Sequence, residues 1–458
     1  MRPSVFKKAF SVHGTFTLPG DKSISHRAVI LGAIAKGRTV VKNFPFNKDC
    51  LATVHILQKL GVSVTSEPRG FGSGIVRVTG CGLHGLKPPG TPLVVQESGT
   101  TFRLMLGLLA GQGFSVMLKA GGPLKKRPML RVTYPLRLMG AGIEAVRLRK
   151  GAAEEEYPPV RIFGAELKPI AYTIPVASAQ VKSALLLAGL YASGKTSVIE
   201  LVHTRDHTER MLRLFRADIA VSQKSKSAVI SVRGKKELVS PGIISVPGDM
   251  SSAAFFIVLA SLIPGSKIRI KNVSLNPSRM GIIGVLKRMN AGVRIQRFSL
   301  KQKSGEQSGD LTAAFSRLKG AVVKNREIPL LIDELPVLMV AACFARGETI
   351  LEGVGELRVK ETDRIRSMTE NLKKMGADIK IRETAEGEDI VINGGSGLDG
   401  APVKSFGDHR TAMSLIVAGL SARGRTRIDD VSCIDKSFPG FLRLLKNTVG
   451  ARHAVPLR

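Results

Sequence analysis

Basic and hydroxyl side chains gather near the start of the chain, in the segment Pro19–Arg27 (PGDKSISHR). A strand-like run precedes this segment, and an apolar helix is expected over Ala28–Ala35. A helix that begins at such a break leaves backbone N–H groups that, together with the helix dipole, favour a bound anion. Lys22, Ser23 and Arg27 add cations and a hydroxyl at the same turn. The segment therefore indicates an anion site, and for a single copy an ordinary N-cap beside a solvated basic turn is the simpler alternative.

The same order of strand, sharp break, polar cluster and apolar helix recurs along the chain. The spacing is roughly 70–85 residues, which indicates internal repetition of one supersecondary unit. The further copies lie at residues 94–103, 174–180, 246–252, 331–336 and 406–411.

Each copy also continues in the same way. The apolar helix is followed by a Gly and a β-branched strand, as in Gly194–Ile199, and then by a second helix that closes in a pattern such as Leu372–Ala377. Two short strands come last, so the unit is strand–helix–strand–helix–strand–strand, and its alternation predicts an α/β fold. About six units most simply make two domains of three units each. Ser240–Gly242 is the best candidate for the boundary from periodicity alone.

One match to a phosphate-binding pattern is rejected on its structural context. Gly189–Thr196 (GLYASGKT) satisfies GxxxxGK[ST]. A loop that cradles a nucleotide phosphate follows a strand and opens a helix. Here a helix is expected before the segment and a strand after it, which is the wrong polarity, so no nucleoside triphosphate site is expected.

Composition places the chain among folded globular proteins. Of its 458 residues, 43% are hydrophobic and 23% charged, and the four cysteines show no paired spacing, so free thiols are expected rather than disulfides or a zinc site. No apolar run is long enough for a membrane span, and the first residues do not resemble a signal peptide, which predicts a cytoplasmic protein. The net charge of +33 suits an anionic partner but does not choose between a polyanion and an acidic small substrate. Few aromatic residues and no Trp disfavour a single-strand stacking platform.

Five segments together carry a family resemblance. They are Arg358–Arg364 (RVKETDR), Pro19–Arg27, Ser178–Gln180, Gly407–Arg410 and Lys436–Pro439. By these segments, and nearly end to end, the chain resembles the 5-enolpyruvylshikimate-3-phosphate synthase family of enolpyruvyl transferases. The resemblance implies an α/β fold of two inverse α/β-barrel-like domains, each of three repeated βαβαββ units, with the active site in the interdomain cleft. It further implies that the chain crosses twice between an N-terminal domain of residues 21–243 and a C-terminal domain of residues 1–20 plus 244–458.

The resemblance also implies a reaction. The carboxyvinyl group of phosphoenolpyruvate would be transferred to the 5-hydroxyl of shikimate 3-phosphate, with release of phosphate. Both substrates are multiply anionic, which suits the compact charge of Lys and the planar fork of Arg. The residues implied for phosphoenolpyruvate are Lys22, Gly99, Thr100, Arg127, Gln180, Arg364, Arg410 and Lys436. Those implied for shikimate 3-phosphate are Lys22, Ser23, Arg27, Ser178, Ala179, Gln180, Arg205, Asp333 and Lys360.

This chemistry needs acid–base groups on both sides of one carbon centre, because the hydroxyl loses a proton while the methylene carbon gains one. We expect Asp333 near the hydroxyl and Glu361 near the methylene carbon, with Lys22 and His409 assisting. Each has a plainer alternative: Asp333 could cap a helix, Glu361 could pair with a neighbouring cation, and His409 could be a capping residue.

Neither a metal ion nor an organic cofactor is required, and no ligand cluster is present in the sequence. We expect a monomer with no membrane partner, which binds nucleic acid only as a non-specific polyanion. Anionic substrates are expected to draw the two domains together. Glu97 and Glu356 replace the Asn expected in the family, and their roles stay open. Gly99 matches glyphosate-sensitive members, which predicts inhibition competitive with phosphoenolpyruvate.

Two other functions are weighed against this one. A sister enzyme transfers the same group to UDP-N-acetylglucosamine on the same fold, but it usually carries a reactive Cys where this chain has Gly121–Pro128 (GGPLKKRP). The second alternative is a polyanion- or nucleic-acid-binding protein on a degenerate transferase scaffold, suggested by the net charge. It predicts binding that weakens steeply with salt and no release of phosphate.

Overall fold

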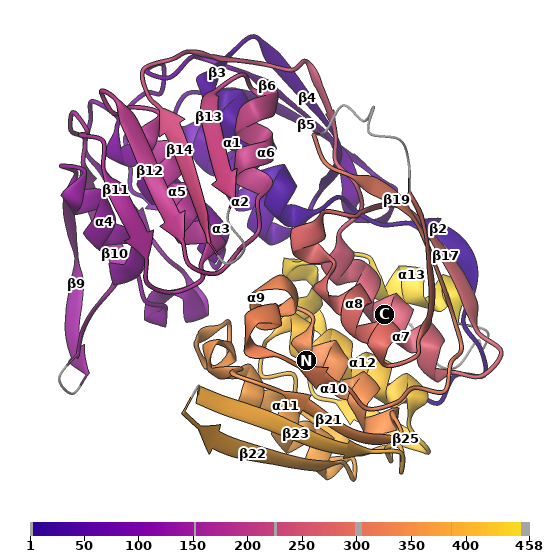
Figure 1. Cartoon of the computed structure of the whole chain (residues 1–458). Helices are drawn as coiled ribbons and strands as arrows, with labels where there is room; N and C mark the ends of the chain where they lie inside the picture. The colour runs from indigo at the N-terminus through magenta and orange to yellow at the C-terminus, as the bar shows by residue number, and fades with distance from the viewer. Residues whose placement is uncertain (1–2, 151–152, 224–226, 298–304, 386, 450–458) are drawn as a thin grey trace. The chain divides into compact units, whose positions relative to one another are not determined.

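The structure, a computed structural model, describes residues 3–150, 153–223, 227–297, 305–385 and 387–449. The described residues form two compact units. Unit 1 comprises Met1–Pro19, Pro247–Leu300 and Gln307–Arg458, and unit 2 comprises Gly20–Val246 and Lys301–Glu306 (Figure 1). The expected domains, 21–243 and 1–20 plus 244–458, stay a prediction, and that prediction does not anticipate the short piece of unit 2 that lies between two parts of unit 1.

Unit 2 contains three four-stranded sheets, in the orders β16-β4-β6-β5, β7-β8-β10-β9 and β11-β12-β14-β13, and one two-stranded sheet, β15-β3. Its strands are β3 (Ala35–Lys36), β4 (Arg38–Pro45), β5 (Ser63–Arg69), β6 (Ser73–Thr79), β7 (Leu93–Val94), β8 (Val116–Lys119), β9 (Gly142–Lys150), β10 (Ala153–Phe163), β11 (Ala171–Ile174), β12 (Lys195–Glu200), β13 (Asp218–Gln223), β14 (Ala228–Arg233), β15 (Leu238–Val239) and β16 (Ile243–Ser245). Its helices are α1 (Lys22–Ile34), α2 (Lys48–Lys59), α3 (Gly99–Ala110), α4 (Leu130–Leu138), α5 (Ala179–Gly189) and α6 (His207–Leu214).

Unit 1 contains two four-stranded sheets, β18-β19-β17-β2 and β20-β21-β23-β22, and the three-stranded sheet β1-β25-β24. Its strands are β1 (Ser4–Lys7), β2 (His13–Thr17), β17 (Lys267–Ser274), β18 (Gly292–Arg297), β19 (Ser308–Ala314), β20 (Val322–Val323), β21 (Gly347–Leu351), β22 (Asp378–Thr384), β23 (Gly387–Gly394), β24 (Pro402–Val403) and β25 (Arg425–Ile428). Its helices are α7 (Met250–Leu262), α8 (Gly281–Arg288), α9 (Ile328–Leu331), α10 (Leu335–Phe344), α11 (Arg364–Lys374), α12 (His409–Ser421) and α13 (Phe441–Thr448).

The sheets are built from the repeat that the sequence predicts. In the second repeat, β7 and β8 flank α3 and pair in parallel, while β9 and β10 form the antiparallel pair at the end of the unit. Two first strands pair outside their own repeat: β2 precedes α1 but pairs in parallel with β17 (Figure 1). Similarly, β16 precedes α7 but pairs in parallel with β4. In the last sheet, β1 lies antiparallel to β25. The first strands of the chain therefore complete sheets whose other strands lie far along the sequence.

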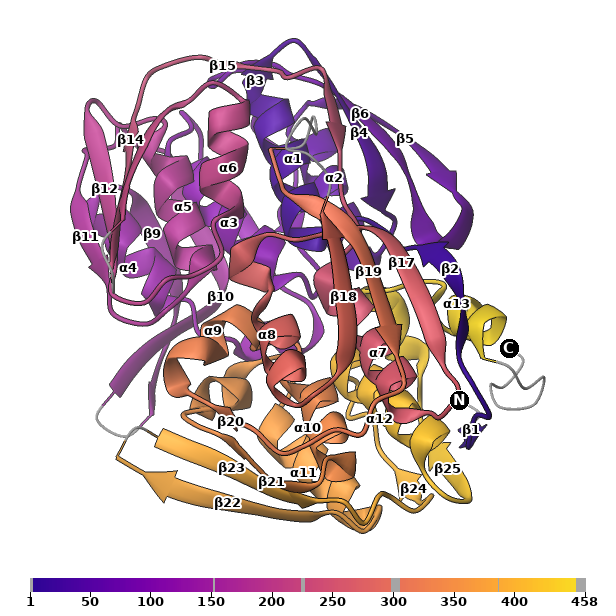
Figure 2. The same ribbon diagram turned by 45° about the vertical axis from the view of Figure 1, so that its right-hand side comes forward.

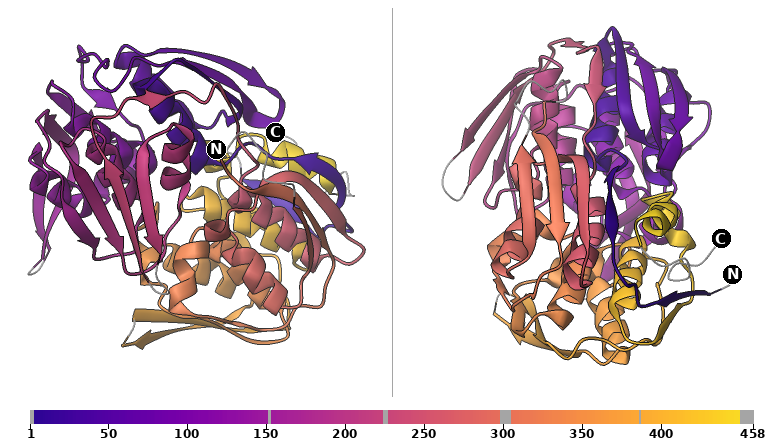
Figure 3. Two further views of the ribbon diagram at one scale, coloured as in Figure 1. Left: turned by 45° about the horizontal axis from the view of Figure 1, so that its top comes forward. Right: turned by 90° about the vertical axis from the view of Figure 1, so that its right-hand side faces the viewer.

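The first helix of each repeat lies in the core of its unit. In unit 1, α7, α10 and α12 pack against one another, and α3 packs against both α1 and α5 in unit 2 (Figure 2). These helices are enclosed on nearly all sides; every residue of α7 from Met250 to Ser261 is buried. The sheets lie outside them, as two further views show (Figure 3), and a strand such as β17 alternates buried and exposed residues. Because the sides of the helices are enclosed, their N-termini are where polar groups can be presented.

Five of the second helices, α2, α4, α6, α8 and α11, are followed by a residue in the left-handed region, whereas α13 ends at the extended residue Val449. Gly61, Gly140 and Gly376 have φ of 84°, 97° and 91°, as expected for a glycine that follows a helix. Asn290 (φ 68°) and Arg216 (φ 62°) follow α8 and α6 in the same conformation. The turn is thus kept even where a side chain makes it less favourable.

Several local expectations can now be compared with the structure. The first helix begins at Lys22 and not at Ala28, because Asp21 caps it and accepts a hydrogen bond from the Ile24 N–H at 3.1 Å. The rejected phosphate-loop pattern lies between the end of α5 and the start of β12, so its polarity is confirmed as wrong. All four cysteines are free thiols. In the part of the chain that the structure describes, no helix has the length and apolar character needed to cross a membrane.

Candidate functional site

The start of α1 brings the first polar cluster of unit 2 together. Lys22 is the first residue of the helix, and its Nζ pairs with Asp49 Oδ2 on α2 at 3.4 Å. Both side chains are partly exposed, so this ion pair is accessible to a ligand. The Ser23 carbonyl accepts a hydrogen bond from Arg27 Nη1 at 2.8 Å. The expectation that Lys22, Ser23 and Arg27 share one helix start is therefore confirmed.

Arg27 is buried and is held by hydroxyl groups from two other helices. Its Nε donates to Thr208 Oγ1 on α6 at 2.6 Å, and its Nη2 donates to Ser183 Oγ on α5 at 2.6 Å. Burial lowers the pKa of Arg27 to about 10, and nearby Arg205 contributes in the same direction, while Glu209 opposes both. The guanidinium stays charged at neutral pH and is fixed in one orientation.

A chain of hydroxyl groups joins α1 to α2 and α3. His26 Nδ1 hydrogen bonds with Thr53 Oγ1 at 2.7 Å, and Thr53 hydrogen bonds in turn with Thr101 Oγ1 at 2.7 Å. Thr101 donates to Ser98, the N-cap of α3, at 2.7 Å. Burial, followed by the positive charges of Lys22 and Arg27, lowers the pKa of His26 to about 3. The imidazole is therefore neutral at physiological pH.

The start of α3 and the start of α5 are joined by Gln180. Its Nε2 donates to Thr100 Oγ1 at 3.0 Å, and its Oε1 accepts from Arg103 Nη1 at 2.8 Å. A Cβ built on Gly99 would lie 2.7 Å from Arg127 Nη1 and 3.2 Å from Arg103 Nη1. The Arg127 guanidinium therefore packs directly against the backbone of the first residue of α3.

The remaining predicted residues of unit 2 lie at the starts of α5 and α6. Ser178 caps α5 and accepts from the Val181 N–H at 3.4 Å. Ala179 is the first residue of that helix, and its carbonyl accepts from Ser183 Oγ at 2.6 Å, the same hydroxyl that Arg27 contacts. Arg205 is partly buried in the loop before α6. Unit 2 thus groups its predicted residues at the starts of α1, α3, α5 and α6.

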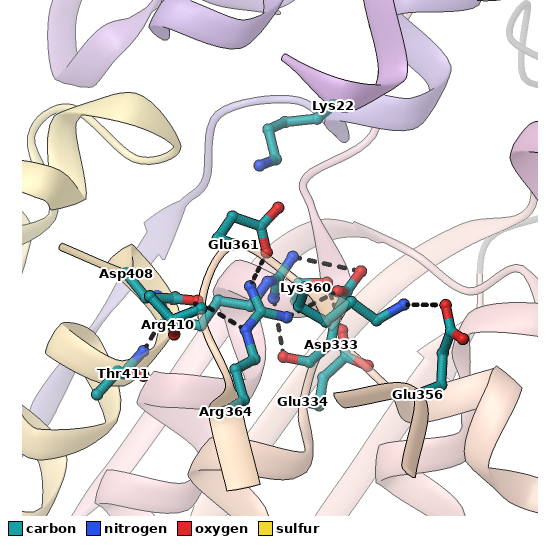
Figure 4. Close-up of polar contacts among 12 residues, drawn as sticks. Lys22, Asp333, Glu334, Glu356, Lys360, Glu361, Arg364, Asp408, Arg410 and Thr411 are labelled. Carbon is teal, nitrogen blue, oxygen red and sulfur yellow. Dashed lines mark hydrogen bonds and ion pairs between the residues drawn. The ribbon is translucent and has the colours of Figure 1, made fainter. Parts of the chain in front are cut away.

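Arg364 is the centre of the polar cluster in unit 1 (Figure 4). It is 1% exposed, and it lies at the start of α11. Its Nε donates to Asp408 Oδ2 at 2.8 Å, its Nη2 to Glu361 Oε2 at 2.5 Å, and its Nη1 to Asp333 Oδ1 at 3.5 Å. Burial alone would lower the pKa of Arg364, but the carboxylates of Asp408, Glu361 and Asp333 raise it above its ordinary value.

Asp333 is also held by a second arginine. Arg410 Nη2 lies 3.4 Å from Asp333 Oδ2, and Arg410 Nη1 donates to the Asp333 carbonyl at 3.0 Å. Asp408 caps α12, since its Oδ1 accepts from the Arg410 N–H at 2.7 Å. Burial would raise the pKa of Asp408, but the charges of Arg364 and His409, together with the hydrogen bond from Arg364, outweigh it and hold the pKa below its usual value. The Asp408 carboxylate at the start of α12 is therefore paired with the Arg364 guanidinium at the start of α11.

The other predicted residues of unit 1 lie around this cluster. His409, at the start of α12, is 5% exposed. Lys360 Nζ pairs with Glu356 at 3.2 Å, which gives a role to one of the two carboxylates left open by the sequence (Figure 4). Glu97, the other, packs against Gly122, where an added Cβ would lie 2.4 Å from its Oε1. Lys436 Nζ donates to the Gly407 carbonyl at 3.5 Å.

Sequence reasoning missed several partners of these residues. Asp408 lies in the segment Gly407–Arg410, but the sequence predicts no role for it, although it is the most deeply buried partner of Arg364. Arg103, which donates a hydrogen bond to Gln180, is the fifth residue of the apolar helix α3, where its charge was the only available signal. Thr208 and Ser183 carry no signal of their own, because hydroxyl residues are common on helices.

The geometry fits the binding of small multiply charged anions. Each unit presents helix N-termini together with arginine or lysine side chains, and this combination favours phosphate and carboxylate groups. The carboxylates of Asp333 and Glu361 both pair with the Arg364 guanidinium, so they lie beside the same cation. Among the described residues, no group of three potential metal ligands is present.

The fold and the cationic helix starts define a class: a repeat-built α/β protein of the enolpyruvyl transferase type. The enolpyruvyl transferase NikO from Streptomyces tendae has the same fold, with a TM-score of 0.74 at 16% identity over 97% of both chains. An EPSP synthase from Acinetobacter baumannii matches with a TM-score of 0.82 at 41% identity, over 98% of both chains.

The sequence comparisons identify the family within this class. The model of the family described as EPSP synthase (3-phosphoshikimate 1-carboxyvinyltransferase) matches residues 7–445. A 3-phosphoshikimate 1-carboxyvinyltransferase from Desulforamulus reducens is 46% identical over 96% of this chain and 97% of its own length. A protein of the same name from Geotalea daltonii is 46% identical over the same shares. The chain belongs to the EPSP synthase family, and the family expected from the sequence is confirmed.

Proposed function

We propose that this protein is a 3-phosphoshikimate 1-carboxyvinyltransferase, which transfers the carboxyvinyl group of phosphoenolpyruvate to the 5-hydroxyl of shikimate 3-phosphate and releases phosphate. The observation that carries the proposal is the family match over residues 7–445, with 46% identity to proteins of that name. The cationic helix starts of both units support it, because both substrates are anions.

The proposed chemistry proceeds by addition and elimination. The 5-hydroxyl oxygen bonds to C2 of phosphoenolpyruvate and loses its proton, while C3 gains a proton to become a methyl group. The intermediate then loses a proton from that methyl group and expels phosphate, which restores the double bond. Asp333 takes the hydroxyl proton, and Glu361 exchanges the proton at C3. Lys22 and His409 assist these transfers.

The binding roles are those that the family resemblance implies, and the contacts of several side chains support them. Arg127, which packs against Gly99, and the pair Arg364 and Arg410 hold the carboxylate and phosphate of phosphoenolpyruvate. Lys436 contributes a further charge. Gln180 orders Thr100 by a 3.0 Å hydrogen bond and so shapes the backbone at the start of α3.

Shikimate 3-phosphate takes the other set of residues. Arg27 and Ser23 face it from α1, and Ser178 and Ala179 face it from the start of α5. Arg205 binds its phosphate, while Asp333 and Lys360 bind its hydroxyl groups. Lys22 binds both molecules. No cofactor or metal ion enters this scheme; the protein acts as a cytoplasmic monomer and binds polynucleotides only through its net charge of +33.

The test measures phosphate released from phosphoenolpyruvate with shikimate 3-phosphate as acceptor, and in parallel with UDP-N-acetylglucosamine. We expect turnover with the first acceptor only. Asp333→Asn and Glu361→Gln are each expected to lower kcat by roughly 10²- to 10⁴-fold, the range for loss of general acid–base catalysis. Asp399→Asn serves as the control, because Asp399 pairs with Arg423 on the exposed surface of the same unit. Turnover with the nucleotide sugar, or variants as active as the control, would contradict the proposal.

A further inference from the structure

The first turn of α6 is a buried junction that no assigned function uses. Its residues His207, Thr208 and Glu209 are 0%, 2% and 3% exposed. Each contacts a different element: His207 Nδ1 lies 2.7 Å from Glu306 Oε1, Thr208 Oγ1 accepts from Arg27 Nε on α1 at 2.6 Å, and Glu209 Oε1 pairs with Lys182 Nζ on α5 at 2.6 Å. Three consecutive side chains thus fix this turn by tertiary contacts.

Local capping contributes little to the position of this turn. Asp206 occupies the N-cap, but its side chain does not cap the helix and instead pairs with Arg210 Nε at 2.8 Å. A capping side chain normally stabilises a helix start by about 1 kcal/mol. Because α6 is only eight residues long and is not capped in this way, its orientation depends on its tertiary partners.

Glu306 lies 99 residues after His207 in the sequence. It lies between β18 and β19, both of which belong to unit 1, yet it groups with unit 2. Its side chain is fully buried, and its second oxygen, Oε2, lies 3.7 Å from Arg210 Nε. A buried carboxylate is costly unless it is paired, so its contact with His207 and Arg210 ties this piece of chain to α6.

Thr208 connects this turn to Arg27, a residue predicted to bind shikimate 3-phosphate. Thr208, next to His207, accepts the Nε hydrogen bond of Arg27, and the same hydroxyl is 2.6 Å from Ser183 Oγ, the partner of Arg27 Nη2. Arg205 precedes the turn by two residues. A shift of the first turn of α6 would therefore move both the hydroxyl that orients Arg27 and the loop that carries Arg205.

We propose that Glu306 is a positioning residue for shikimate 3-phosphate: through His207 it fixes the first turn of α6, and through Thr208 that turn orients Arg27. This inference rests on the proposed function. It assigns to Glu306 a role in the affinity for one substrate and not for the other, because Arg27 belongs to the shikimate 3-phosphate set alone.

The test compares Glu306→Ala and Glu306→Gln with a matched buried carboxylate. Glu156, in the same unit, is 1% exposed, and it pairs with Arg137 on α4 at 2.9 Å and with Arg147 on β9 at 3.2 Å. Glu156→Ala therefore reports the general cost of removing a buried, paired carboxylate. The readouts are KM for each substrate, kcat, and amide hydrogen exchange of residues 207–214.

We expect Glu306→Ala to raise KM for shikimate 3-phosphate roughly tenfold, the size of a lost charge-assisted hydrogen bond at Arg27, with KM for phosphoenolpyruvate within twofold. Glu306→Gln keeps a neutral hydrogen bond to His207 but loses the charge, so a two- to fivefold rise is expected. Exchange in α6 is expected to quicken in the same order. Glu156→Ala is expected to lower thermal stability without changing either KM by more than twofold.

The inference is overturned if the Glu306 variants leave KM for shikimate 3-phosphate within twofold of wild type, or if both KM values rise together. If Glu306→Ala does not fold, Glu306→Gln decides the question by the same criterion. Failure of the proposed function is distinguishable, because it would appear as absent phosphate release in the wild-type protein. In that case the substrate assignment falls, while the exchange data still show whether Glu306 orders α6.

Discussion

Neutral His26 makes the stability of this protein sensitive to mild acid. The ring is 2% exposed, and its pKa is lowered from 6.5 to about 3, chiefly by burial and then by the charges of Lys22 and Arg27. In the unfolded chain the same ring takes up a proton near pH 6.5. Below that pH the unfolded state binds more protons than the folded state, so stability is lost as the pH falls from about 6.5 towards 3.

The size of the effect follows from the separation of the two pKa values. A pH of 5.0 lies 1.5 units below the pKa of 6.5, so the ring is protonated in the unfolded chain and still neutral in the folded one. The free energy of unfolding is therefore about 2 kcal/mol lower at pH 5.0 than at pH 7.5. His26→Gln removes the titration but can keep a hydrogen bond to Thr53. We therefore expect the variant to lose about 2 kcal/mol less than wild type between pH 7.5 and 5.0, whatever its stability at pH 7.5.

Urea unfolding followed by far-ultraviolet circular dichroism measures this difference, since the chain has no Trp for fluorescence. His55→Gln is the matched control, because His55 lies on the exposed face of α2. It should follow the wild-type dependence on pH. Equal losses of unfolding free energy for wild type and His26→Gln would refute the reasoning, and would mean that the ring is not buried in its neutral form.

Three further predictions concern the site itself. Gly99→Ala places a Cβ 2.7 Å from Arg127 Nη1, so KM for phosphoenolpyruvate should rise roughly tenfold with KM for shikimate 3-phosphate unchanged. Steady-state kinetics with each substrate varied measures both values, and an unchanged KM for phosphoenolpyruvate would show that the close contact is unimportant. Asp408→Ala leaves Arg364 without its most buried partner and uncaps α12, so urea unfolding should show a loss of about 3–5 kcal/mol, against a smaller loss for the cap-retaining Asp408→Asn. Glyphosate should inhibit competitively with phosphoenolpyruvate, and undiminished turnover in millimolar inhibitor would contradict this.

The repeat and the polar residues at its helix starts could be predicted from the sequence alone. The polar clusters at helix starts, the closing turns at Gly61 and Gly376, and the order of strands and helices are all local patterns, and the structure contains them, although α1 begins six residues earlier than expected. The same local reading rejected the phosphate-loop match at Gly189–Thr196, because polarity is a property of neighbouring elements. The family resemblance rested on short segments of this kind, and the comparisons confirm it.

What the local patterns could not provide is the set of partners for each charge. Arg27 takes its orientation from Thr208, 181 residues away, Arg364 from Asp408, 44 residues away, and His207 from Glu306, 99 residues away. Hydrogen bonds over such separations leave no periodic trace in a single sequence, since any of many hydroxyl or carboxylate residues could supply the partner. The sequence therefore determined which helix starts carry charge, and only the tertiary structure decided which neighbours hold each charge in place.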